Sequence, residues 1–65
     1  MEDLFQRRSE RGLTMRQVAD AAQITEGYYC LIEHGERRPS VFAAQRIAKI
    51  LGFDWTEFFK EKNEG

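Results

Sequence analysis

Apolar residues recur along the chain with the period of an α-helix rather than the alternation of a β-strand. Two sets fall at positions i, i+3, i+4 and i+7, and each would form one apolar stripe on a helix: Met15, Val18, Ala19 and Ala22, and Ala44, Ile47, Ala48 and Leu51. With the capping residues described next, the pattern predicts an all-α fold of five helices, over residues 3–11, 15–22, 26–34, 41–51 and 55–61.

Residues that begin and end helices stand at the boundaries of these segments. Thr14 with Gln17 has the spacing of a capping box, and Asp54 with Glu57 repeats that spacing before the last segment. The third and fourth segments are preceded by residues whose side-chain oxygens can accept a bond from a helix amide: Thr25 and Ser40. Three segments are followed by a glycine, which can close a helix in the left-handed conformation: Gly12, Gly35 and Gly52.

The second and third segments are joined by a very short connection. If the second helix ends near Ala22 and Thr25 caps the third, Gln23 and Ile24 make up nearly the whole turn. Two helices joined this tightly cross at a large angle, which is the geometry of a helix-turn-helix. We expect Ile24 to insert into the core and fix that angle.

The length of 65 residues allows one domain, which we place over residues 1–65 with its core over about 3–61. The single cysteine cannot form an intramolecular disulfide, and no apolar run approaches the ~20 residues that cross a bilayer. We therefore expect a cytoplasmic protein without a membrane partner. A net charge of −1 argues against an evenly polybasic nucleic-acid binder, although a local basic surface is compatible with it.

Enzymatic chemistry finds almost no support in the sequence. We find no set of serine, histidine and acid with room for a pocket, no glycine-rich phosphate loop and no metal-ligand motif. We expect no catalysis, no small-molecule substrate, no cofactor and no metal. Cys30 is expected to pack as a small side chain rather than act as a redox switch, and His34 to complement the negative end of the third helix.

Seven spaced fragments form a specific set when they are taken together. They are Arg8-Ser9-Glu10-Arg11-Gly12-Leu13-Thr14, Val18-Ala19, Ile24-Thr25, Ile32-Glu33-His34-Gly35, Arg38-Pro39-Ser40, Ile47-Ala48-Lys49-Ile50-Leu51-Gly52 and Asp54-Trp55-Thr56-Glu57-Phe58-Phe59. With this set the chain resembles, over almost its whole length, the Cro/C1-type (XRE) helix-turn-helix repressors. The resemblance implies a compact five-helix, lambda-repressor-like domain in which the third helix enters the DNA major groove.

The resemblance also implies contacts to the phosphates of double-stranded DNA. The amino end of the second helix would point at one phosphate, which its amides and partial positive charge suit. The loop after the third helix would contact a second phosphate, and two arginines on the first helix are weaker candidates. The candidate residues are Arg7, Arg11, Arg16, Gln17, Arg37 and Arg38.

Base reading, by the register of the resembling family, belongs to the exposed face of the third helix and one residue of the second. These positions are Met15, Thr25, Glu26, Gly27, Tyr28 and Leu31. The family commonly has polar or basic side chains at several of them. Here Glu26 can accept a bond from a cytosine amino group, and the apolar side chains can contact a thymine methyl. For Gly27 we consider close approach of the backbone to DNA, a helix that starts late, or a lost function.

Two pairs of residues are assigned structural or partner roles. The resemblance pairs Arg8 with Glu33 as an ion pair from the first helix to the end of the third, which we interpret as structural rather than catalytic. Trp55 and Phe59 lie four residues apart, and they either share an outward surface or cover the small core. In the resembling repressors dimers form near this end, which implies a homodimer on a two-fold operator.

The leading hypothesis is a sequence-specific DNA-binding transcriptional regulator, repressor-like in action. The alternative is a protein–protein interaction module on the same scaffold, motivated by the near-neutral charge, by Glu26 and by apolar groups where polar readers are usual. The arrangement of Arg16, Arg37 and Arg38 distinguishes the two. DNA binding needs them on one face with the start of the third helix, whereas an interaction module would have them dispersed or paired.

Overall fold

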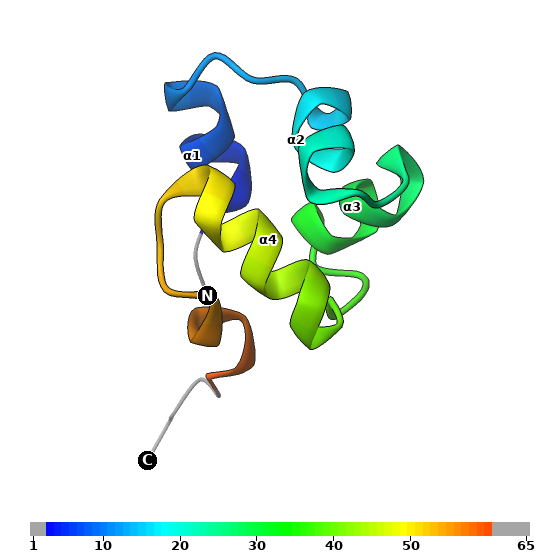
Figure 1. The fold of residues 1–65 in the computed structure, drawn as a ribbon, viewed down its shortest axis with the longest axis vertical. Helices are drawn as coiled ribbons and strands as arrows, with labels where there is room; N and C mark the ends of the chain where they lie inside the picture. The colour runs from blue at the N-terminus through cyan, green and yellow to red at the C-terminus, as the bar shows by residue number, and fades with distance from the viewer. Residues whose placement is uncertain (1–2, 61–65) are drawn as a thin grey trace.

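A computed structural model describes residues 3–60, which form four α-helices and a final 3-10 helix (Figure 1). The helices are α1 (Leu4–Glu10), α2 (Met15–Ala22), α3 (Glu26–Glu33), α4 (Val41–Leu51) and the 3-10 helix η1 (Trp55–Phe59). Within residues 3–60 the regular secondary structure is entirely helical, as the hydrophobic pattern predicts. The ends of the proposed domain 1–65, and residue 61 of the expected last helix, lie outside the described residues.

Side-chain caps set the helix boundaries. At the start of α2, Gln17 N donates to Thr14 Oγ1 at 3.0 Å and Thr14 N donates to Gln17 Oε1 at 2.8 Å, which is the predicted capping box. Thr25 accepts from the amide of Tyr28 and Ser40 from the amide of Ala43. These local bonds explain why α2 and α4 begin where the sequence predicts.

The last helix is 3-10 rather than α-helical. In place of the expected capping box, the Asp54 carboxylate accepts bonds from the Thr56 amide at 3.0 Å and the Thr56 hydroxyl at 2.8 Å. Glu57 instead accepts from Lys60 Nζ at 3.0 Å. A side-chain bond to the second residue along favours a tight turn, and such short runs commonly adopt the 3-10 form. The bonds from Thr56 hold the pKa of Asp54 below its ordinary value.

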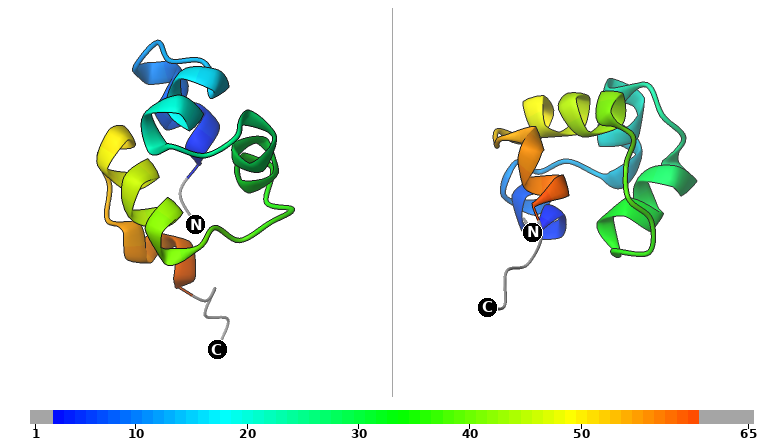
Figure 2. Two further views of the ribbon diagram at one scale, coloured as in Figure 1. Left: turned by 45° about the vertical axis from the view of Figure 1, so that its right-hand side comes forward. Right: turned by 90° about the horizontal axis from the view of Figure 1, so that it is seen from below.

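The hydrophobic core surrounds α4, with α2 and α3 on one side of it and α1 and η1 on the other (Figures 1 and 2). Both predicted stripes are buried, except that Met15 is half-buried at the edge. The stripes pack against four larger buried side chains: Leu4, Tyr29, Ile32 and Phe58. This packing holds α3 by its inner face and leaves its outer face for other contacts.

Candidate nucleic-acid interface

The turn between α2 and α3 has the predicted length. Gln23 ends α2 in the left-handed conformation, with φ 63°. The amide of Ile24 then donates to the Ala19 carbonyl at 3.0 Å, and the Ile24 side chain is half-buried against the core. The turn is therefore anchored at both backbone and side chain, and α2 and α3 form a helix-turn-helix (Figure 2).

The two sides of α3 differ sharply in exposure. Its inner side carries Tyr29 and Ile32, both completely buried. Its outer side carries four residues at i, i+3, i+4 and i+7, of which Cys30 is half-buried and the others exposed: Gly27, Cys30, Leu31 and His34. Thr25 and Glu26 are exposed at the amino end of the same helix. The predicted base-reading residues Thr25, Glu26, Gly27 and Leu31 are thus all exposed, and we call the exposed surface of this helix the outer face of α3.

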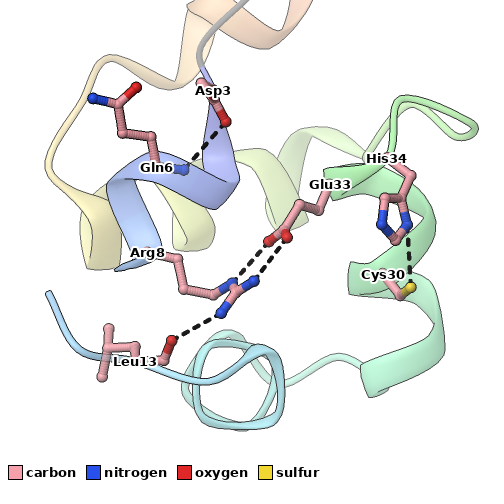
Figure 3. Close-up of polar contacts among 7 residues, drawn as sticks. All are labelled: Asp3, Gln6, Arg8, Leu13, Cys30, Glu33 and His34. Atoms are coloured by element: carbon pink, nitrogen blue, oxygen red, sulfur yellow. Dashed lines mark hydrogen bonds and ion pairs between the residues drawn. The ribbon is translucent and has the colours of Figure 1, made fainter. Parts of the chain in front are cut away.

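Cys30 and His34 belong to this outer face, although the sequence analysis placed neither of them there. The Cys30 sulfur lies 3.4 Å from Nδ1 of His34, one turn further along α3 (Figure 3). Cys30 is half-buried and lies outside the buried core. The sequence does contain a pattern that predicts this. Gly27, Cys30, Leu31 and His34 recur at helical spacing, on the side of the helix opposite its buried residues.

Two of the predicted base readers are engaged in packing. Met15 is half-buried against the core. Tyr28 is also half-buried against it, and its phenol oxygen accepts a bond from the Ser40 amide at 2.9 Å. Tyr28 therefore ties α3 to the start of α4 and holds the end of the loop that leads into α4.

The predicted phosphate contacts of α2 lie at its amino end. Arg16 extends into solvent, with 76% of its side chain exposed, and lies 3.9 Å from Asp20 one turn along. At this distance and exposure the pair is worth little and leaves the guanidinium available to another anion. The side-chain oxygen of Gln17 is occupied by the capping box.

The arginines of the α3–α4 loop each lie over an aromatic ring. The guanidinium carbon of Arg37 is 5.6 Å from the ring centroid of Tyr28, and that of Arg38 is 5.7 Å from the ring centroid of Phe59. Both arginines are exposed. The two rings come from α3 and η1, so adjacent loop residues are supported by different elements.

The arginines of α1 lie elsewhere. Arg7 Nη1 donates to the Gly52 carbonyl at 3.4 Å, and its guanidinium lies 4.8 Å from the ring centroid of Phe53. Arg11 donates to the Arg7 carbonyl at 3.4 Å and approaches Gly52. Both contacts are at the carboxyl end of α4, on the opposite side of the molecule from α3 in Figure 1. The structure does not bring Arg7 and Arg11 together with the outer face of α3.

The ion pair between Arg8 and Glu33 is bidentate (Figure 3). The nitrogen–oxygen distances are 2.9 and 2.8 Å, and a third guanidinium nitrogen donates to the Leu13 carbonyl at 3.0 Å. The hydrogen bonds from Arg8 lower the pKa of Glu33, and the same bonds raise the pKa of Arg8. The pair joins α1 to the carboxyl end of α3 and so fixes the orientation of the outer face.

Trp55 and Phe59 pack inward to a considerable extent. Both are half-buried against the core, and their rings meet edge-on with centroids 6.0 Å apart. The large apolar side chains that are exposed among residues 3–60 lie elsewhere: Phe5, Leu31, Val41 and Phe42. Of the two interpretations left open by the sequence, this placement favours a cover over the core.

No helix among residues 3–60 is long and apolar enough to cross a membrane. The same residues contain no group of three or more histidine, cysteine, aspartate or glutamate side chains placed to hold a metal ion.

Comparison with protein families matches residues 4–58 to the helix-turn-helix family. The chain therefore belongs to this family, and its motifs and fold are those of the Cro/C1 type. A solved structure, the N-terminal DNA-binding domain of SinR from Bacillus subtilis, has the same fold, with a TM-score of 0.75 and 24% sequence identity. That match covers 94% of this chain and 90% of the SinR domain.

Among curated proteins, an uncharacterised HTH-type transcriptional regulator of Bacillus subtilis, YqaF, is 50% identical over 58 residues. The match covers 89% of this chain and 76% of YqaF. The HTH-type transcriptional regulator DdrOP3 of Deinococcus deserti is 33% identical, over 98% of this chain and 54% of its own length. PuuR of Escherichia coli is 30% identical, over 83% of this chain and 29% of its own length. The chain thus spans about half of DdrOP3 and under a third of PuuR.

Proposed function

We propose that the chain is a sequence-specific, DNA-binding transcriptional regulator that acts as a repressor-like homodimer in the cytoplasm. It would insert α3 into the major groove of double-stranded DNA and act by occupancy, without catalysis. The relatives described above are HTH-type transcriptional regulators, and the SinR domain is a DNA-binding domain. The observation that carries the proposal is the exposed outer face of α3, together with exposed arginines at the start of α2 and in the α3–α4 loop.

Base reading would fall to the side chains that the outer face presents. Glu26 would accept from a cytosine amino group, and Leu31, 37% exposed, would contact a thymine methyl. Cys30 and His34 extend this surface along the helix, whereas the predicted readers Met15 of α2 and Tyr28 of α3 are half-buried. Gly27 would allow the backbone to approach the duplex closely.

Phosphate contacts would come from Arg16, Arg37 and Arg38. All three are exposed: Arg16 lies in the first turn of α2, and Arg37 and Arg38 lie in the loop between α3 and α4. Gln17 would contribute through its side-chain amide nitrogen, because its backbone amide donates to Thr14 and its side-chain oxygen accepts from Thr14 in the capping box. We leave Arg7 and Arg11 out of the proposed interface, since their contacts are with the end of α4.

The competing function is binding of a protein partner through the same face. The exposure of Leu31 on a helix that also carries the exposed, acidic Glu26 favours it. Such a module would bind its partner without neutralising phosphates, so its binding would show little of the steep salt dependence of DNA complexes.

Fluorescence polarisation against a randomised duplex pool, at about 50 and about 200 mM salt, tests the proposal. We expect salt-sensitive binding and enrichment of a preferred sequence. Leu31→Glu, which adds a carboxylate to the outer face of α3, should weaken binding at least about tenfold. Gln45→Glu adds the same charge at an exposed position of α4 and should bind like the wild type. Absence of salt-sensitive binding, or equal effects of the two variants, would contradict the proposal.

A further inference from the structure

The loop that carries Arg37 and Arg38 is connected to η1, an element with no role in the proposed interface. The connection is the contact between the Arg38 guanidinium and the ring of Phe59, at 5.7 Å from the ring centroid. A cation at this distance over an aromatic face is attracted by the negative charge of the ring face. The direction of an exposed loop arginine is therefore biased by a residue twenty-one positions further along the chain.

The backbone under Arg38 is restricted as well. Arg38 precedes Pro39, which disfavours helical backbone angles at Arg38, and Pro39 is buried. The next residue, Ser40, donates its amide to the Tyr28 phenol oxygen at 2.9 Å. Directly before the arginine, the Arg37 amide donates to the Leu31 carbonyl at 3.2 Å. The loop is thus held in place on both sides of the arginine, so that the side chain is the part left to be ordered.

Phe59 is itself held firmly. It is half-buried against the core and touches two other aromatic rings, Trp55 at 6.0 Å and Phe58 at 6.5 Å between centroids. Phe58 is almost completely buried and links this group to α4. The ring under Arg38 therefore belongs to a packed aromatic cluster, which we define as Trp55, Phe58 and Phe59.

We propose that Phe59 is a positioning residue for DNA binding: it holds the Arg38 guanidinium in place for a phosphate contact. This inference rests on the proposed function. An arginine on a solvent-exposed loop samples many rotamers, and ordering it when DNA binds costs conformational entropy. A ring already in contact with the guanidinium reduces that cost before DNA arrives. The aromatic cluster then contributes to DNA affinity without touching DNA.

The test compares two leucine variants of the chain on the duplex selected from the random pool. Phe59→Leu removes the ring under Arg38 and keeps apolar bulk. Phe53→Leu is the matched control, because Phe53 is also half-buried, packs against Phe58 at 5.4 Å and lies under Arg7 rather than Arg38. We expect Phe59→Leu to weaken binding about two- to fivefold and Phe53→Leu to leave it unchanged. Phe59→Tyr, which keeps the ring, should restore wild-type affinity.

The same substitution in an Arg38→Gln background separates positioning from folding. We expect Phe59→Leu to cause no further loss of affinity there, because the side chain that it positions is gone. Thermal melts of all variants without DNA record any loss of stability, and titrations run well below the lowest melting temperature. The same loss of affinity in both backgrounds would indicate a structural effect and overturn the inference.

Three other outcomes are informative. Tighter binding by Phe59→Leu would show that the ring holds the arginine away from DNA, and would also overturn the inference. Failure of the wild-type chain to bind any duplex would remove the proposed function and this inference with it. Wild-type binding with equal affinities of Phe59→Leu and Phe53→Leu would remove this inference alone.

Discussion

Among the acidic residues that the structure describes, Glu33 has the most buried carboxylate. Its side chain is 5% exposed and that of Arg8 is 13% exposed, so both charges lose most of their hydration on folding. Two short parallel hydrogen bonds compensate for that loss. Removal of one partner leaves the other enclosed and unpaired, which costs more than the pair itself contributes.

Glu33→Ala should therefore lower the free energy of unfolding by about 3 kcal/mol. Glu36→Ala removes an exposed carboxylate three residues along and should change it by less than about 0.5 kcal/mol. Urea denaturation of both variants, followed by circular dichroism, measures the difference. Equal midpoints would show that the ion pair does not hold α3.

The same carboxylate predicts a loss of stability in acid. Hydrogen bonds from Arg8 lower the pKa of Glu33 in the folded protein below its ordinary value of 4.5. Its stabilising contribution is therefore complete above about pH 4.5 and declines as the pH falls through the folded-state pKa, since the unfolded chain takes up the proton first. Thermal melts from about pH 6 to about pH 3 should show this decline.

Glu33→Gln should flatten the decline, while Glu36→Gln should keep the wild-type profile. Some loss of stability in acid should persist in Glu33→Gln, because the hydrogen bonds from Thr56 also lower the pKa of Asp54. Profiles of Glu33→Gln and wild type that run parallel through this range would contradict the assignment.

At the scale of the element, α3 has a glycine in its first turn. The helix begins at Glu26, so a late start of the helix does not explain Gly27. A Cβ atom built on Gly27 would have nothing within 4 Å, whereas one on Gly52 would overlap the Arg11 guanidinium. Gly52 also has φ +78°, where an L side chain is strained. The two glycines therefore differ in what an added methyl group would do.

Gly27→Ala should raise the free energy of unfolding by up to about 1 kcal/mol, because alanine favours the helix. Gly52→Ala should lower it by about 1 kcal/mol or more. If the backbone at Gly27 approaches DNA, Gly27→Ala should also weaken DNA binding despite the gain in stability. Paired denaturation and polarisation titrations measure both effects, and unchanged affinity would argue against close approach.

The element boundaries that the sequence predicts best are those set by local bonds. The predicted α2 and α4 match the observed helices because Thr14 and Ser40 cap them through amides three residues away. The 3-10 form of η1 was not predicted, since Asp54 and Glu57 have capping-box spacing but bond to Thr56 and Lys60 instead. Near Asp54 and Glu57 several donors and acceptors lie within hydrogen-bonding reach of one another, and residue spacing alone does not predict which of them pair.

The candidate site likewise has features that follow from local sequence and features that depend on long-range contacts. The outer face of α3 follows from helical register, which the sequence contains. The contact of Tyr28 with Ser40 spans twelve residues and depends on where the α3–α4 loop returns. The same holds for Arg7, whose partner Gly52 is 45 residues away. Packing between residues far apart in the chain decides which polar side chains already have a hydrogen-bond partner. No short sequence pattern predicts such long-range contacts.

For the whole molecule, the distribution of charge matters more than its sum. The net charge is −1, so DNA would not be attracted to the chain uniformly. Part of the positive charge is neutralised by internal partners, as in the pair of Arg8 with Glu33. The proposed phosphate contacts instead use three exposed arginines: Arg16, Arg37 and Arg38. Affinity should therefore come from a few local contacts and depend on salt in proportion to their number.

Three phosphate contacts predict a slope of about −2.7 for the logarithm of the binding constant against the logarithm of salt concentration, per copy bound. A duplex with two half-sites about 34 Å apart should bind two copies and double that slope.

Arg37→Gln should reduce the slope on one half-site by about 0.9, whereas Arg46→Gln, which removes an exposed arginine of α4, should leave it unchanged. Polarisation titrations from about 50 to about 200 mM salt measure these slopes. Equal reductions in the two variants would mean that the loop does not meet the phosphates, and a single slope on both duplexes would mean that one copy binds alone.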